Sequence, residues 1–482
     1  MRDDHILRAL RDHIDPDRLA ACLARLRAAL PDPARPSSAT VLVAYGGGKD
    51  SAYTTAFVRA LQLALRGEAG ATFRLRLATN RHAGMPQAVQ ANIDRTYRAL
   101  GIPDDPDCEA LLIDGELVRP FDASLPQHPA VVRRNRTDIL MNGHRTGADG
   151  RPTFCNACNL SVATSFGLAA AHGTGVDVIV TGDSPAEQRA YLAWIRGLGR
   201  RLGALPDGGG GGFGGVLDTV DGIGRTYFAD LYGADDPEAH RGERPPPPAH
   251  LRFFSIYDHT AYAAGAHWEL LTGFLGFAFD DLAFSFTESD CANPALMAHL
   301  RGLKHERVFG RDYAEGIGTY VDFATGLMRR KEIPEDLIRL VADRYRGPAG
   351  IARMRAAMDA YASGTFGLAE RQLVCMAWAP FAAAGRDLDA YLAAERVPVD
   401  PGEARGVLTG GDDPVAAAVL EEYSGLPPRL LRVLYGSDRY EPAAARPDGI
   451  VATILEGDPH TAEITTRHTP DGPAVTETIS GR

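Results

Sequence analysis

A short apolar stretch, three glycines and a helical run stand in succession near the N-terminus and constrain the fold more than any other feature. The apolar stretch is Val41–Tyr45, the glycines are Gly46–Gly48, and Lys49, Asp50 and Ser51 open the helical run. Small and apolar residues in a row are typical of a buried parallel strand. Glycines let backbone N–H groups turn toward a ligand, and a helix N-terminus adds partial positive charge. The sequence therefore predicts a site for a phosphate-bearing ligand, with Ser51 as a hydroxyl donor.

Strand and helix patterns alternate after this point. The predicted elements are strands at 41–45, 74–80, 110–114 and 176–183, and helices near 51–66, 87–100 and 158–172. Such alternation predicts an α/β fold with a doubly wound parallel sheet, and the later chain predicts a mainly helical second part. Ligands of such sheets bind at the carboxyl ends of the strands. We therefore expect Gly46–Ser51, Asn80 and Gly182–Asp183 to surround one crevice.

Composition and the periodicity of hydrophobic residues divide the chain into five segments. They are an N-terminal helical segment at 1–38, a nucleotide-binding domain at 39–205, a linker or lid at 206–250, a second-half region at 251–370, and a helical region with a tail at 371–482. The third segment contains a glycine cluster and a proline run, which favour a linker over a lid. Weak alternation over 449–482 predicts a hairpin or tail.

Composition also limits the classes of protein. With 482 residues and 45% hydrophobic content, the chain can bury a large core. It has no apolar run of about 18 residues and no apolar signal region at its start, so we expect a cytoplasmic protein without a membrane partner. The formal net charge of −11 argues against a nucleic-acid partner, which would need a basic face.

The glycine loop differs from two common phosphate-binding loops. A Walker A loop has four residues between its first glycine and its Gly-Lys pair, and in a dinucleotide-binding loop no Lys-Asp pair follows the glycines directly. Gly46–Ser51 instead resembles the SGGxDS loop of the PP-loop ATP pyrophosphatases, within the adenine nucleotide α-hydrolase superfamily. The departure is at the first position, where this chain has Tyr45 or Gly46 in place of serine.

The resemblance implies cleavage of ATP between its α and β phosphates and adenylation of an oxygen of the substrate. It implies that the N–H groups of Gly46–Gly48, with Lys49 and Ser51, hold the β and γ phosphates. Asp50 would orient the loop or bind Mg²⁺, and Asp183 would serve the metal or the substrate. Gly182 and Asn80 would also line the nucleotide site.

Cys155 and Cys158 form a CxxC pair, which can bind a metal ion or a cluster, or act as a redox pair. A closed metal site needs further ligands, for which Cys291 is the first candidate, followed by Cys108 and Cys375. Cys291 lies in a polar stretch where core packing gives no reason for a cysteine.

Two branches of the PP-loop superfamily share parts of this order of motifs. A glycine loop, a CxxC helix and a strand ending in Thr181–Asp183 resemble the PP-loop sulfurtransferases that thiolate tRNA. That resemblance implies Cys155, Cys158 and Cys291 as ligands of a [4Fe–4S] cluster, with Zn²⁺ as the alternative. The segments Gly182–Gln188 and Phe309–Tyr313 resemble the N-acetyl sugar amidotransferases.

The sequence thus predicts an enzyme that adenylates a carbonyl or carboxylate oxygen and releases AMP and pyrophosphate. Sulfur transfer to a small-molecule or carrier-bound substrate is the first expectation, which would require a sulfur donor. The alternative is an amidotransferase that uses ammonia or a partner glutaminase, and a third is a non-catalytic nucleotide sensor.

Overall fold

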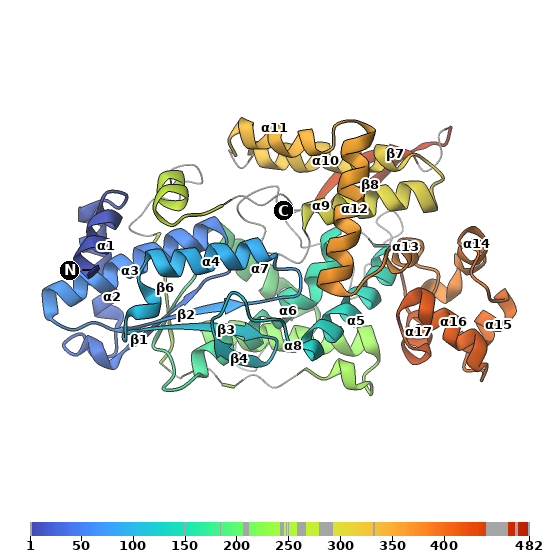
Figure 1. Ribbon diagram of the computed structural model, residues 1–482. Helices are drawn as coiled ribbons and strands as arrows, with labels where there is room; N and C mark the ends of the chain where they lie inside the picture. The colour runs from blue at the N-terminus through green and yellow to red at the C-terminus, as the bar shows by residue number, and fades with distance from the viewer. Residues whose placement is uncertain are drawn as a thin grey trace.

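The fold is known from a computed structural model of the chain. It describes residues 2–148, 150–183, 185–205, 212–241, 245–246, 248, 250–257, 267–278, 293–330, 333–439, 461–467 and 471–480. Figure 1 shows an elongated molecule with a sheet-containing part near the N-terminus and helices at the opposite end.

The described strands form one six-stranded sheet and one separate hairpin. The strands are β1 (Thr40–Ala44), β2 (Arg74–Asn80), β3 (Cys108–Asp114), β4 (Leu117–Pro120), β5 (Val178–Val180), β6 (Arg252–Phe254), β7 (Thr461–Arg467) and β8 (Ala474–Ser480). The sheet order is β4-β3-β2-β1-β5-β6, and every pair except β3–β4 is parallel. The β7–β8 pair is antiparallel, in agreement with the hairpin among the two alternatives, hairpin or tail, predicted for 449–482.

Helices make up most of the remaining structure. In the first half they are α1 (Arg2–Arg11), α2 (Pro16–Ala29), α3 (Lys49–Ala69), α4 (Gln87–Ala99), α5 (Pro129–Thr146), α6 (Gly150–Ala171), α7 (Pro185–Arg201) and α8 (Gly212–Tyr232). In the second half they are a π-helical turn (Glu269–Phe274), α9 (Pro294–Leu303), a second π-helical turn (Lys304–Val308), α10 (Tyr313–Arg330), α11 (Glu335–Arg344), α12 (Gly347–Phe366), α13 (Glu370–Trp378), α14 (Leu388–Ala394), α15 (Pro401–Leu408), α16 (Pro414–Ser424) and α17 (Pro428–Tyr435). Short 3₁₀ turns lie at Pro36–Ser38, Ile102–Asp104, Pro237–Ala239 and Ala383–Gly385.

Helices cover both faces of the sheet, and the strand sequences explain why. Val41 and Val43 of β1 point into an apolar cluster shared with α3 and α4, whereas Leu42 points into one shared with Ala169 and Ala170 of α6. Successive side chains of a strand point to opposite faces, so a strand that is apolar throughout is buried on both sides. Figure 1 shows α3 and α4 along one face. The predicted α/β fold is confirmed, and the sheet is parallel except for the edge strand β4, which the sequence analysis did not predict.

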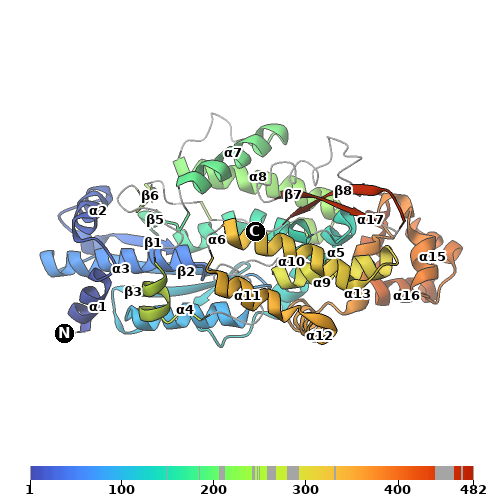
Figure 2. The same cartoon turned by 90° about the horizontal axis from the view of Figure 1, so that it is seen from above.

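A second apolar core is built by helices from both halves of the chain. Every residue of α9 is buried, and apolar side chains of α5, α8, α10, α12 and α13 join the same cluster. Figures 1 and 2 both place α14–α17 at the end of the molecule farthest from α1 and α2. The predicted helical second part and helical N-terminal segment are therefore present.

The structure differs from the sequence-based expectations in three segments. The CxxC helix begins at Gly150, not near 158, so Cys158 lies two turns inside α6 and not at its positively polarised end. Helix α8 lies within the predicted linker or lid at 206–250, because Leu217, Val220 and Ile223 give it a buried apolar face. Strand β6, just past the predicted boundary at 250, pairs with β5 of the sheet.

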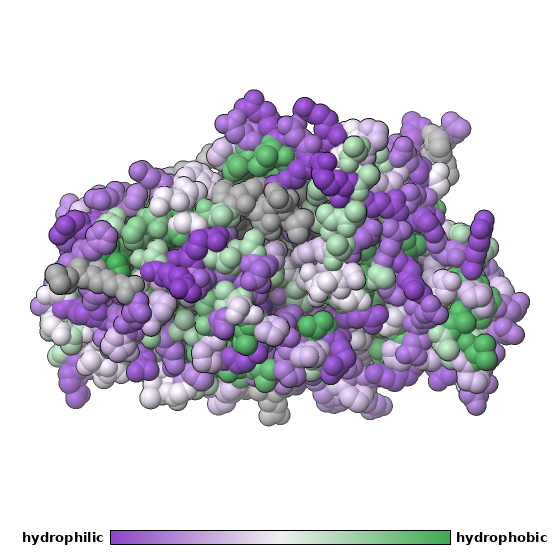
Figure 3. All heavy atoms as spheres, viewed as in Figure 1, coloured by the Kyte–Doolittle hydropathy of each residue, from purple (hydrophilic) through white to green (hydrophobic). Residues whose placement is uncertain are grey.

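The surface is polar over the face seen in Figure 3, where hydrophobic residues form only small scattered patches. None of the helices in the described part of the chain is both long and apolar enough to span a membrane.

Candidate nucleotide site at the carboxyl edge of the sheet

The strand order places a topological switch point between β1 and β5. From β1 the chain proceeds to β2 and β3 on one side, and β5 and β6 lie on the other. In open α/β sheets, ligands bind where the connections diverge in this way, outside the carboxyl ends of the strands. The glycine loop after β1 and the segment Thr181–Asp183 after β5 both lie at this point.

Backbone geometry explains Gly47, the middle glycine of the loop. Gly47 has φ of +84°, and a Cβ there would lie 2.5 Å from Cγ1 of Val89 in α4. A side chain is therefore excluded by both conformation and space. Gly48 is the N-cap of α3, and its carbonyl accepts the first helical hydrogen bond, from the N–H of Ala52 at 3.0 Å. The loop delivers the chain directly onto the helix N-terminus, where backbone N–H groups lack helical partners.

Tyr45, the residue directly before the three glycines, belongs to the core. Its side chain is 1% exposed, its hydroxyl donates to Thr96 at 3.0 Å, and its ring packs edge-on against Tyr97. Burial raises the pKa of the Tyr45 phenol. Tyr45 therefore points into the core and away from the loop.

Charged and hydroxyl side chains follow on the first turn of α3. Lys49 is 4% exposed, and its Nζ lies 2.6 Å from Oδ1 of Asp50. The hydroxyl of Ser51 donates to the carbonyl of Gly48 at 3.0 Å. One cation, one carboxylate and one hydroxyl are thus gathered at a helix N-terminus, an arrangement suited to an anion with an associated metal ion.

The segment after β5 packs tightly against this turn. A Cβ on Gly182 would lie 2.7 Å from both N and Cα of Ser51, so only glycine fits. The hydroxyl of Tyr257 donates to the carbonyl of Gly182 at 3.1 Å and lies 3.3 Å from Oγ1 of Thr54. Burial raises the pKa of the Tyr257 phenol, and the nearby carboxylates of Asp50 and Asp183 raise it further. The structure therefore brings Asp183 and Asp50 to the same edge.

Asn80 ends β2 at this edge, and a buried ion pair follows it. Arg81 donates from Nε to Oδ1 of Asp114 at 2.7 Å, and its Nη2 pairs with the second carboxylate oxygen. Arg119 pairs with the same carboxylate. The side chain of Asp114 is fully buried and that of Arg81 is 3% exposed, so the pair joins the ends of β2 and β3 as a structural element.

Only some of the candidate metal-binding cysteines lie among the described residues. Cys158 is half-buried on α6 against the apolar cluster of the helical part, whereas the Cys155 side chain and all of Cys291 lie outside the described residues. The described residues contain no group of three His, Cys, Asp or Glu side chains that could hold a metal ion. Burial raises the pKa of the thiols of Cys108 and Cys375 to about 12, which disfavours the thiolate that a metal requires.

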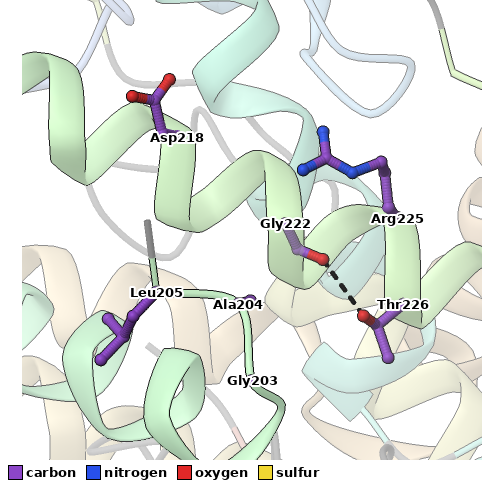
Figure 4. A pocket seen from close by; sticks show the side chains of 7 residues that line it. All are labelled: Gly203, Ala204, Leu205, Asp218, Gly222, Arg225 and Thr226. Carbon is purple, nitrogen blue, oxygen red and sulfur yellow. Dashed lines mark hydrogen bonds between the residues drawn. The ribbon is translucent and has the colours of Figure 1, made fainter. Parts of the chain in front are cut away.

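A pocket of about 460 Å³ lies beside α8 (Figure 4). It is lined by Gly203, Ala204, Leu205, Asp218, Gly222, Arg225 and Thr226. None of these lining residues belongs to the predicted site, and the pocket plays no part in the function proposed below.

Two aromatic residues of the edge were not predicted as site residues. Tyr53 follows the loop within α3, and His267 stacks on it from a segment far along the chain. Tyr53 follows Lys49 by four residues, a spacing that puts both on one helix face. The sequence contains no comparable signal for His267, because only the packed structure brings its segment to α3.

Comparison of the chain with models of known protein families, with curated proteins and with solved structures finds no match.

Proposed function

We propose that this chain binds ATP at the loop Gly46–Ser51 and adenylates an oxygen of its substrate, releasing pyrophosphate. The observation that carries the proposal is the fit of Gly182 against the backbone of Ser51, because it joins the glycine loop to the segment after β5 at the switch point. The finer fold assignment, an adenine nucleotide α-hydrolase type of doubly wound sheet, is part of the same proposal. The strand order and the two covered faces support it.

The proposed reaction has two displacements. A carbonyl or carboxylate oxygen of the substrate attacks the α phosphorus, the bond from that phosphorus to the α–β bridging oxygen breaks, and pyrophosphate leaves. A nucleophile then attacks the activated carbon and AMP leaves. Backbone N–H groups at the start of α3, with Lys49, neutralise charge on the departing pyrophosphate. Asp50 and Asp183 are the carboxylates suited to hold Mg²⁺, which would neutralise more of that charge.

Sulfur is the proposed nucleophile, on the ground of the CxxC pair. Cys155 and Cys158 are three residues apart in the sequence, and both belong to α6. Of the three proposed thiols, that of Cys158 lies among the described residues. The substrate is a small or carrier-bound molecule. Amide transfer from ammonia is the alternative that the metal test below distinguishes.

The proposed chemistry predicts AMP and pyrophosphate as the products of ATP. Ser51→Ala should lower the rate on the order of 10²-fold, because it removes a hydroxyl at the first turn of α3. Separation of nucleotides after turnover with candidate substrates measures both. Thr319→Ala, which removes an exposed helical hydroxyl on α10, is the matched control and should leave the rate unchanged. Formation of ADP alone, or an unchanged rate in Ser51→Ala, would contradict the assignment.

The sulfur-transfer branch predicts iron and labile sulfide in protein purified without oxygen. Replacement of Cys155, Cys158 or Cys291 by serine should remove the metal and the product together while ATP still binds. Cys375→Ser is the control, because burial keeps this residue a neutral thiol. Zinc, or protein without metal that is still active, would instead support amide transfer. Full metal and activity in Cys291→Ser with loss in Cys155→Ser would exclude the three-thiolate site.

A further inference from the structure

His267 lies over the first turns of α3. Its ring stacks on that of Tyr53, with the centroids 3.7 Å apart and the planes at 15°. Tyr53 is 4% exposed, so the stacked face of the imidazole is covered. Because Tyr53 follows Lys49 by four residues and Asp50 by three, the imidazole lies on the helix face that carries this ion pair.

The electrostatic surroundings of His267 agree with this position. Burial lowers the pKa of the imidazole, Lys49 lowers it further, and Asp50 acts in the opposite direction. The ring is therefore neutral near pH 7, with one nitrogen as donor and the other as acceptor. Both charged residues of the first turn act on the ring, in agreement with its stacking position over the start of α3.

The Nε2 atom of His267 has no visible role within the protein. It is buried, and no group in the described part of the chain hydrogen-bonds to it. Leaving a buried polar atom without a partner is unfavourable, and native proteins do it rarely. If the ring served only to pack on Tyr53, phenylalanine would do so without this cost.

We propose that His267 is a phosphate-binding residue and that its Nε2–H donates to an oxygen of the β or γ phosphate of ATP. This inference rests on the proposed nucleotide site and adds a residue that comes from outside the glycine loop. Stacking on Tyr53 fixes the ring, so little side-chain freedom is lost when the ligand binds. A bound phosphate oxygen would supply the partner that Nε2 lacks.

The test distinguishes hydrogen bonding by the Nε2 atom from packing by the aromatic ring. His267→Phe keeps an aromatic ring on Tyr53 and removes both nitrogens. It should weaken binding of Mg-ATP and of Mg-pyrophosphate by about 10- to 100-fold, measured by titration calorimetry, and leave AMP binding unchanged. The unliganded variant should unfold at the same or a higher temperature, since no unpaired polar atom is buried. His267→Gln, whose amide nitrogen reaches the position of Nε2, should recover part of the lost affinity.

The outcomes keep this inference distinct from the proposed function. If the wild type binds ATP, Ser51→Ala weakens that binding and His267→Phe does not, His267 is a packing residue and only the inference is wrong. Equal loss of AMP and pyrophosphate binding in His267→Phe would mean that the substitution disturbs the whole site, and loss of AMP binding alone would place the imidazole at the adenosine end; either result would overturn the inference. If the wild type binds neither ATP nor pyrophosphate, both proposals are wrong. His172→Phe serves as the control, because His172 lies near Glu109 at the start of β3, at the amino-terminal ends of the strands and away from the glycine loop.

Discussion

Replacing Gly182 by alanine should lower the rate of ATP-dependent AMP formation by about 100-fold or more. The new Cβ would meet N and Cα of Ser51 at 2.7 Å and the carbonyl carbon of Asp50 at 3.1 Å. These are backbone atoms at the start of a helix, so they cannot move aside as a flexible side chain does. The first turn of α3 must shift, and a shift of about 1 Å at a catalytic site can cost 100-fold.

The same substitution should reduce stability less than it reduces activity. Overpacking of this kind costs about 1–3 kcal/mol in the free energy of unfolding. Steady-state kinetics and urea denaturation of the same preparation will measure the loss of activity and the loss of stability separately. Gly197→Ala in α7 is the matched control, because a Cβ there meets no atom and alanine favours helix. If Gly182→Ala forms AMP at the wild-type rate, the contact between the two segments has no part in catalysis.

The largest effect on stability is expected at Asp114. Its carboxylate is fully buried and accepts hydrogen bonds from Arg81, whose side chain is 3% exposed. Asp114→Ala would leave the Arg81 guanidinium buried with its main charge partner removed. Breaking a buried ion pair on one side costs about 3–5 kcal/mol, which should appear as a lower midpoint of urea denaturation.

A neighbouring exposed pair provides the comparison. Glu116 pairs with Arg134 at 2.9 Å, and both side chains are more than 40% exposed. Exposed pairs contribute little, so Glu116→Ala should change the free energy of unfolding by about 0.5 kcal/mol or less. Asp114→Asn should fall between the two. A cost for Asp114→Ala as small as that for Glu116→Ala would show that Arg81 finds water or another acceptor.

The sequence predicted the strand–loop–helix unit well because its signals are local. An apolar run between polar segments specified β1, and the glycines specified a turn that ends on a helix, as Gly47 with its positive φ shows. The predicted elements 74–80 and 87–100 coincide closely with β2 and α4. The sequence analysis missed helix α8 because the glycine cluster before it led to the prediction of a linker for the whole segment. Leu217 and Val220 nevertheless have the spacing of residues on one helix face.

Local patterns contain less information about the site than about the fold. The tight fit of Gly182 depends on its distance from Ser51, and the position of His267 depends on a stacking contact with Tyr53. Each contact joins residues far apart in the sequence, and no periodicity or motif within one segment specifies it. The three-thiolate prediction stays a prediction, because Cys291 and the side chain of Cys155 lie outside the described residues.

By itself, the sequence determined which segments form strands and helices around the loop and which residue types stand at the loop. These follow from side-chain size, polarity and backbone freedom, which act over a few neighbouring residues. Only the tertiary structure decided that Tyr45 turns into the core, that Gly182 touches Ser51, and that His267 covers Tyr53. The physical reason is that strand order and helix packing set the distances between remote segments, and steric fit and unpaired polar atoms exist only once those distances are set.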